Sequence, residues 1–236
     1  MRDFPGIPEW VEENFSKPPR ESDLVFRLDP AGTQTNASLH GRDPAYACAQ
    51  GYRVAARLAV EHIREGGRDQ NYLIFPIVYL YRHHVELTLK RLILKADDAG
   101  VRHRTGNERL SEGVRNKVEG EGNWTHSLQW LWDQLRPALL ALGNKVVPQE
   151  DIKRLNSYIR QLNEIDPKGV EFRYTTAIEE TKDKLKKVQQ YGHVLGIQKF
   201  AERMERLANY LEGLDCYFDE LVDCYHQFLA DSHNSS

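Results

Sequence analysis

One apolar seam constrains the fold of this chain more than any other sequence feature. Apolar residues recur at alternating spacings of three and four at Ile197, Phe200, Met204, Leu207, Leu211, Leu214, Phe218, Leu221, Tyr225 and Phe228. This spacing puts the side chains on one face of an α-helix, along a seam roughly 46 Å long. Such a face predicts a helix that packs against the core of a bundle, and a dimerising seam is the alternative that stays open.

The rest of the chain shows further helical patterns and almost no strand pattern. Apolar spacings predict helices over about 43–65, 70–98, 124–142 and 149–164, the first beginning at Asp43-Pro44. We therefore predict an all-α fold, a helical bundle of about five main helices. The expected segments are an irregular N-terminal arm at 1–42, the bundle at 43–230 and a disordered tail at 231–236, with a mobile loop at 99–123 inside the bundle.

Composition limits the classes of protein to consider. The 236 residues carry a net charge of -3, which argues against a strongly basic nucleic-acid binder but allows a local basic patch. The three cysteines suggest no disulfide framework and are interpreted as small buried thiols. The longest apolar run, at 72–81, is too short to span a bilayer, and the first residues contain no apolar signal segment. We expect a cytoplasmic protein without membrane contact.

Strong catalytic and metal-binding motifs are absent from the sequence. It contains no phosphate-binding loop, no dinucleotide-binding glycine fingerprint, no Cys-x-x-Cys pair and no His-Glu-x-x-His pair. The histidines do not follow the spacing of a zinc site. We therefore expect neither a metal nor a cofactor.

A charged stripe crosses the apolar helix predicted at 70–98. Arg82, Glu86 and Lys90 stand four residues apart, so they lie along one face. Charges on a buried helix must be paired, and Glu86 can reach both cations. One positive charge is then left for an acidic group or a phosphate. The stripe is interpreted either as a structural ion-pair network or as part of an anion- or RNA-facing pocket.

A turn and an arginine between aromatic residues follow the fourth predicted helix. The residues DPKG at 166–169 match a type I turn position by position. In an extended chain beyond the turn, Phe172 and Tyr174 would share one face and Arg173 would point to the other. An arginine held in this way favours bidentate contact with a carboxylate or phosphate. Glu86 is the internal partner that would make Arg173 structural.

Three segments in this order resemble bacterial helical proteins of the HEPN-like group. They are YRHHVELTLKRLI at 81–93, HSLQWLWDQL at 126–135 and DPKGVEFRY at 166–174, and the resemblance covers about residues 45–225. It implies an all-helical bundle, frequent dimerisation, and links to RNA cleavage, toxin–antitoxin systems or phage defence.

Catalytic members of that group carry an Arg followed four to six residues later by a His on a late helix. The pair supplies a cation for the phosphate and an imidazole for proton transfer. Here that spacing occurs only from Arg57 to His62, on the first predicted helix. A cleaving site would therefore have to be assembled from separate segments, and the candidates are Arg82, His83 and His126, together with Arg173.

Three functions are consistent with these observations. The first is a HEPN-like module that binds RNA, a nucleotide or a protein partner such as an antitoxin in bacterial stress or defence, with ligand-binding candidates Arg82, Glu86, Lys90 and Arg173. The second is a metal-independent endoribonuclease using Arg82, His83 and His126. The third is a structural helical adaptor. The sequence leaves open whether the chain is an enzyme, and the resemblance leads us to expect a homodimer.

Overall fold

The described part of the chain is entirely helical apart from its connections. The computed structural model describes residues 37, 43–66, 68–101, 109–120, 125–170, 172–173 and 194–234, and these ranges contain no strand. Their helices are α2 (Pro44–Arg64), α3 (Gln70–Asp98), α4 (Glu112–Glu119), α5 (Leu128–Leu142), α6 (Gln149–Ile165) and α9 (Ile197–Asn234). The all-α prediction is confirmed. The predicted arm at 1–42 lies outside the described residues except for Ala37.

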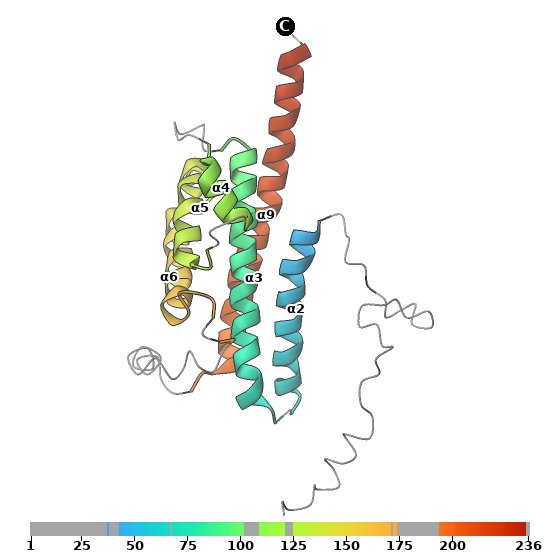
Figure 1. Ribbon diagram of the computed structural model, residues 1–236, viewed down its shortest axis with the longest axis vertical. Coiled ribbons are helices and arrows are strands. Elements are labelled where there is room, and N and C mark those ends of the chain that lie inside the picture. The colour runs from blue at the N-terminus through green and yellow to red at the C-terminus, as the bar shows by residue number, and fades with distance from the viewer. Residues whose placement is uncertain are drawn as a thin grey trace, which may run out of the picture. The chain divides into compact units, whose positions relative to one another are not determined.

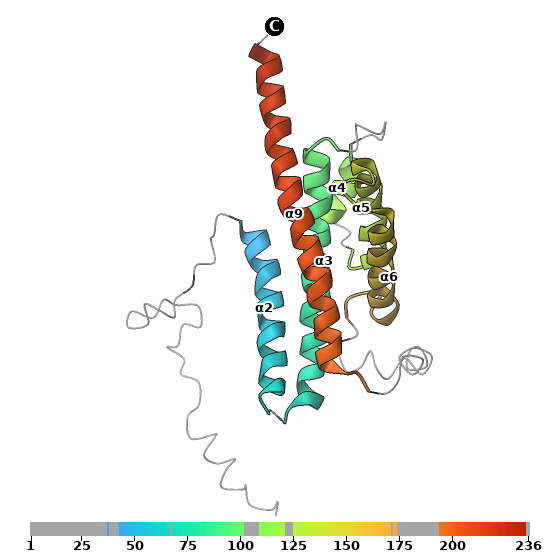
Figure 2. The same ribbon diagram turned by 180° about the vertical axis from the view of Figure 1, so that it is seen from behind.

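Helix α3 is the centre of the bundle. It packs against α2, α4, α5 and α9, while α6 packs against α5. Figure 1 shows α3 between α2 on one side and α5 and α6 on the other, and Figure 2 shows α9 running beside it. The first half of its sequence is apolar nearly all round, which is the pattern of a helix surrounded by others. No helix in the described ranges is both long and apolar enough to cross a membrane; the cytoplasmic location stays a prediction.

Local capping residues define the ends of α2 and α5. The Asp43 carboxylate accepts a hydrogen bond from the Tyr46 amide at 2.9 Å, so α2 begins at Pro44 as expected. The Ser127 hydroxyl accepts one from the Trp130 amide at 3.2 Å and starts α5. Gly143 ends α5 with a positive φ of 79°. The start of α2 and the end of α5 thus agree with the prediction, whereas α5 begins at Leu128 and not at about 124.

Helix α4 was missed by the prediction of a loop over 99–123. Ser111 caps its start, and Gly120 ends it in the left-handed conformation. Val118 is buried in the core between these caps. The helix has only eight residues and one fully buried side chain, so its apolar period is too short to stand out in a segment rich in charge.

The C-terminal seam is buried over only part of its length. Phe218 is fully buried, whereas Phe228 is 67% exposed. In both views the end of α9 extends past the neighbouring ends of α2 and α3 (Figures 1 and 2). The first two thirds of the seam thus face the core, and the dimerising role stays a prediction for the rest. The helix also continues to Asn234, so residues 231–234, assigned to the tail at 231–236, are helical.

The interpretation of the cysteines as buried thiols was wrong. Cys48 on α2 and Cys216 and Cys224 on α9 are all exposed and unbonded to one another. A helical period places a residue on the core side only when it follows the apolar face, and these three lie off that face.

Candidate functional site

Five charged or titratable side chains from three chain segments meet beside α3. They are Arg82, Glu86 and Lys90 from α3, His126 from the segment before α5, and Asp166 from the end of α6, and we call them the Glu86 cluster. Only the α3 members are close in sequence. The structure therefore joins the predicted stripe to two residues that the helical spacing could not place.

Arg82 is the structural hub of the Glu86 cluster. Its Nη1 donates to Glu86 Oε2 at 2.9 Å, and its Nε and Nη2 donate to the Asp166 carbonyl at 3.1 and 3.0 Å. Nη2 also donates to the His126 carbonyl at 2.5 Å. The side chain is 1% exposed and also forms an ion pair with the Asp166 carboxylate at 3.2 Å. Because most of its five N–H donors are used internally, Arg82 positions the site rather than contacting a ligand.

Glu86 is a buried carboxylate surrounded by donors. Its Oε1 lies 3.0 Å from Lys90 Nζ and 2.9 Å from His126 Nδ1, and its Oε2 lies 3.9 Å from His83 Nδ1. Burial by itself would raise the pKa of Glu86. The hydrogen bonds and positive charges around it outweigh burial and hold that pKa well below its usual range. Glu86 is thus ionised and can fix the orientation of both imidazoles.

The predicted charge balance needs a correction. From the sequence, the stripe has one more positive charge than negative, because Glu86 alone pairs with both Arg82 and Lys90. The structure supplies a second anion, because Asp166 pairs with Arg82. The positive excess at this surface therefore comes from Arg173, which lies nearby.

The turn after α6 is held directly against Arg82. The Val170 amide donates to Asp166 Oδ1 at 2.9 Å, and Gly169 has a φ of +71°. A Cβ atom at Gly169 would lie 2.8 Å from Arg82 Nη1 and 3.2 Å from His126 Cβ. Glycine is therefore required here by its backbone conformation and by the close approach of two cluster residues.

Arg173 lies at the surface of the same region, in a different setting from the predicted one. Residues 172–173 form a turn rather than an extended strand, with the Arg173 amide donating to the Val170 carbonyl at 3.0 Å. Arg173 does not pair with Glu86. Its Nε donates to the Gly169 carbonyl at 2.8 Å, and its guanidinium lies 5.3 Å from the ring centroid of Tyr79. Tyr174, which was predicted to share a face with Phe172, lies outside the described residues.

An aromatic group connects Arg173 to the Glu86 cluster. The Tyr79 ring stacks on His83 with centroids 5.4 Å apart, and Tyr52 meets His83 edge-on at 4.5 Å. Burial raises the pKa of Tyr52, while the nearby Arg173 acts in the opposite direction. His83 therefore links the aromatic group to the Glu86 cluster, since it stacks on Tyr79 and faces Glu86.

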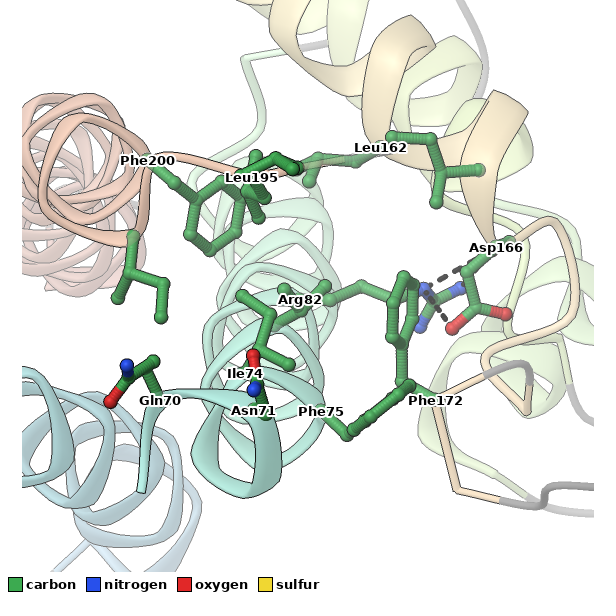
Figure 3. A pocket seen from close by; sticks show the side chains of 14 residues that line it. Gln70, Asn71, Ile74, Phe75, Arg82, Leu162, Asp166, Phe172, Leu195 and Phe200 are labelled. Carbon is green, nitrogen blue, oxygen red and sulfur yellow. Dashed lines mark hydrogen bonds and ion pairs between the residues drawn. The ribbon is translucent and has the colours of Figure 1, made fainter. Parts of the chain in front are cut away.

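A cavity of about 440 Å³ lies on the other side of Arg82. Figure 3 shows the Arg82–Asp166 pair on its wall near Phe172, with Phe200 and Leu195 across the opening. Its remaining lining is mainly apolar and comes from the first turns of α3, the last turn of α6, the segment just before α9 and the first turn of α9. The buried arginine thus separates an apolar cavity from the polar surface that carries the histidines.

A second charged cluster lies on the α2 and α9 side of α3. Arg53 donates to Glu205 at 2.7 Å and to Glu212 at 2.9 Å, and it also contacts Asn209. The Tyr81 hydroxyl donates to Glu205 at 3.1 Å, and burial raises the pKa of Tyr81. We call this the Arg53 cluster. All of its members come from helices.

The Arg-to-His spacing on the first helix does not join either cluster. Arg57 is exposed, and His62 lies 3.3 Å from Asp69 with over half of its side chain exposed. Sequence reasoning brought together Arg82, Glu86 and Lys90, and it singled out His83 and His126 only as separate candidates. It missed the roles of Gly169 and Tyr79. Glycine in a DPKG turn was the available signal for the first, and four-residue spacing from His83 for the second.

Within the part of the chain that the structure describes, no group of three or more His, Cys, Asp or Glu side chains is arranged to hold a metal ion. Comparison with protein-family models, curated proteins and solved structures finds no match. The HEPN-like resemblance therefore stays a prediction.

Proposed function

We propose that this protein is a helical binding module for a phosphate-bearing ligand, RNA or a nucleotide, and that the ligand binds where Arg173, Tyr79 and His83 adjoin the Glu86 cluster. The predicted HEPN-like relationship and a role in bacterial stress or defence belong to the same proposal. The observation that carries it is the setting of Arg173.

Arg173 combines an exposed charge with a fixed position. Its Nε donates to the Gly169 carbonyl and its Cζ lies over the Tyr79 ring, yet it makes no ion pair with any described residue. A guanidinium held in this way keeps its Nη groups for a bidentate acceptor such as a phosphate. The aromatic group beside it offers a surface on which a base can stack.

Two neighbouring imidazoles add hydrogen-bonding groups to the same surface. His83 and His126 are partly exposed, and each faces the buried carboxylate of Glu86. The ring nitrogen of each histidine that does not face Glu86 can contact a phosphate oxygen. Because the phosphate is attracted by charge, binding is expected to weaken as salt concentration increases.

Binding is tested with a fluorescently labelled single-stranded RNA and with a labelled nucleotide, both followed by fluorescence anisotropy. Arg173→Ala is expected to lower affinity by about tenfold while leaving the fold intact. Arg160→Ala removes the same charge from an exposed position on α6 and serves as the matched control. Equal affinity for wild type and Arg173→Ala, or no binding by the folded wild type, would contradict the proposal.

RNA cleavage is the second candidate function, and the Glu86–His126 contact favours it. A carboxylate that binds Nδ1 of a partly exposed histidine fixes the tautomer and supports proton transfer at the opposite ring nitrogen. His83 and Lys90 face the same carboxylate, so a second imidazole and a cation lie close by. This arrangement supports proton transfer and phosphate stabilisation without a metal.

Cleavage is tested by incubating the protein with mixed RNA in the presence of a metal chelator. His126→Gln and His83→Gln keep a polar side chain and are cleaner variants than Arg82→Ala, which removes a buried hub. Loss of cleavage in folded His126→Gln would support the nuclease function. Cleavage that is unchanged in both variants would trace the activity to a contaminant.

The structural adaptor is the outcome that remains if neither RNA nor nucleotide binds. In that case the Glu86 cluster is an internal ion-pair network, and a protein partner, an antitoxin or a second copy of the chain becomes the object of the search. Size-exclusion chromatography with light scattering tests the predicted homodimer separately.

A further inference from the structure

A smaller pocket between α6 and α9 presents a repeated pattern of residues. Its volume is about 240 Å³, and its lining residues are all described: Asp151, Arg154, Leu155, Tyr158, Arg206, Leu207 and Tyr210. Helix α6 contributes RLNSY at 154–158 and α9 contributes RLANY at 206–210. The same Arg-Leu-x-x-Tyr sequence therefore faces the pocket from both sides.

The two copies of this pattern form a symmetrical lining. Leu155 and Leu207 are almost fully buried and make an apolar floor, whereas Tyr158 and Tyr210 are half-buried. The two helices run in opposite directions, as Figures 1 and 2 show. The arginine of one helix is therefore expected at the same end of the pocket as the tyrosine of the other.

The charges of the two ends differ. At one end, Arg154 Nη1 lies 2.7 Å from Asp151 Oδ1, and the Tyr210 hydroxyl donates to Asp151 Oδ2 at 3.2 Å. Burial and the Asp151 charge raise the pKa of Tyr210 to about 12, so its hydroxyl stays a donor. At the other end, the exposed Arg206 makes no ion pair or hydrogen bond with the described residues. Among the described residues, the charge of Arg206 is therefore the one that no acid of the pocket compensates.

We propose that this pocket binds one nucleotide unit, with its base over the leucine floor between the tyrosines and its phosphate at Arg206. An apolar floor with aromatic walls suits a planar ring, and a single free guanidinium suits a single phosphate. The volume lies below the range of about 300–1,000 Å³ common for pockets that enclose a whole drug-sized molecule, which favours one unit over a larger ligand. The inference is independent of the proposed function, because the two sites share no residue.

A free nucleotide and a single strand of nucleic acid supply the same chemistry, and the experiment separates them. A labelled single-stranded RNA is titrated with the full-length protein at fixed salt, and an unlabelled nucleoside monophosphate is added as competitor. Competition by the monophosphate identifies a free-nucleotide site. Competition only by single strands, with a weaker effect of double-stranded RNA or of an abasic strand, identifies a nucleic-acid subsite.

Variants connect the binding to this pocket. Arg206→Ala and Tyr158→Ala are each expected to lower affinity by about tenfold, and Tyr158→Phe is expected to restore it because the ring is kept. Arg203→Ala removes an exposed arginine of the same helix that does not line the pocket, and it should bind as the wild type does. Circular dichroism checks the folding of Tyr158→Ala; Arg206 is exposed, so its removal tests the inference even if that variant is unstable.

Three outcomes would overturn the inference. The first is wild-type affinity in Arg206→Ala, and the second is an equal loss in Arg203→Ala and Arg206→Ala, which would indicate diffuse attraction. The third is the absence of binding to any of the ligands. A loss confined to Arg173→Ala would support the proposed function alone, and a loss confined to Arg206→Ala would support this pocket alone.

Discussion

The Glu86 cluster and the Arg53 cluster are both charge networks that include a side chain of α3, but they are built from different parts of the chain. The Arg53 cluster joins α2, α3 and α9 through side chains that all lie on helices. The Glu86 cluster joins α3 to two segments outside regular structure. A network between helices holds the bundle together. A network between a helix and loops also places exposed groups, here His126 and Arg173, at defined positions.

The comparison is tested most strongly by removing the arginine at the centre of each network. Arg82→Ala leaves the carboxylates of Glu86 and Asp166 buried without their partner, and we expect a loss of about 3–5 kcal/mol in the free energy of unfolding. Arg53→Ala should cost less, about 1.5–3 kcal/mol, because Glu205 and Glu212 are partly exposed and can bind water. Urea denaturation measures both values. Equal losses would show that the two networks are equivalent.

Gly169→Ala changes the loop side of the Glu86 cluster without removing a charge. The substitution forces a positive φ on alanine and places its Cβ against Arg82, so we expect a loss of about 1–3 kcal/mol together with weaker ligand binding. Gly213→Ala is the control, since nothing lies within 4 Å of that position on α9 and alanine should stabilise the helix by about 0.5–1 kcal/mol. Thermal unfolding of both variants is the measurement. A stable Gly169→Ala with normal binding would argue against the close approach.

The two sides of α3 should also respond to different pH ranges. Burial lowers the pKa of His84, which bonds to the Ala49 carbonyl on the α2 side, so the unfolded chain takes up this proton at higher pH than the folded one. Stability is expected to be full above the ordinary value of 6.5 and to fall as pH drops below it. Glu86, with its lowered pKa, contributes stability above 4.5 that is lost below it.

Denaturation curves measured across this pH range would separate the two effects. His84→Gln keeps a polar side chain but cannot titrate. It should flatten the dependence of the free energy of unfolding on pH near 6.5 and leave the dependence near 4.5 unchanged. If the free energy of unfolding of that variant still fell below pH 6.5 with the same slope, the dependence would belong to another histidine.

The smallest expected effect on stability is that of Arg173→Ala. The side chain is exposed and unpaired with any acid among the described residues, so the change in the free energy of unfolding should stay within about 0.5 kcal/mol. The same variant is predicted to lose ligand binding. A large loss of stability would instead show that Arg173 has a structural role, as the members of the Arg53 cluster do.

The parts of the site that the sequence predicted are those set by helical spacing. Arg82, Glu86 and Lys90 contact one another because residues four apart share a helix face, and the boundaries of α3 and α6 followed from their apolar periods. His126 and Asp166 join them only through tertiary packing, for which the sequence has no period. The turn at 166–169 was predicted from its own residues. The hydrogen bond from Arg82 to the carbonyl of Asp166, across 84 positions of the chain, was not predicted.

Two local misses have local reasons. The eight residues of α4 carry a serine cap and a terminal glycine, and these signals were outweighed by the charged composition around them. The extended chain expected at 172–173 assumed that the turn ended at Gly169. In the structure a second turn follows at once through the Arg173–Val170 hydrogen bond.

The bonds that Arg82 makes have a consequence for the order of folding. Its contacts with the carbonyls of His126 and Asp166 close loops of 44 and 84 residues, and closing long loops costs chain entropy before any contact repays it. The Glu86 cluster should therefore form late, after α5 has docked on α3 and α6 on α5. A ligand that recognises the finished cluster would bind only the complete bundle, and its affinity would be added to the stability of all three segments together.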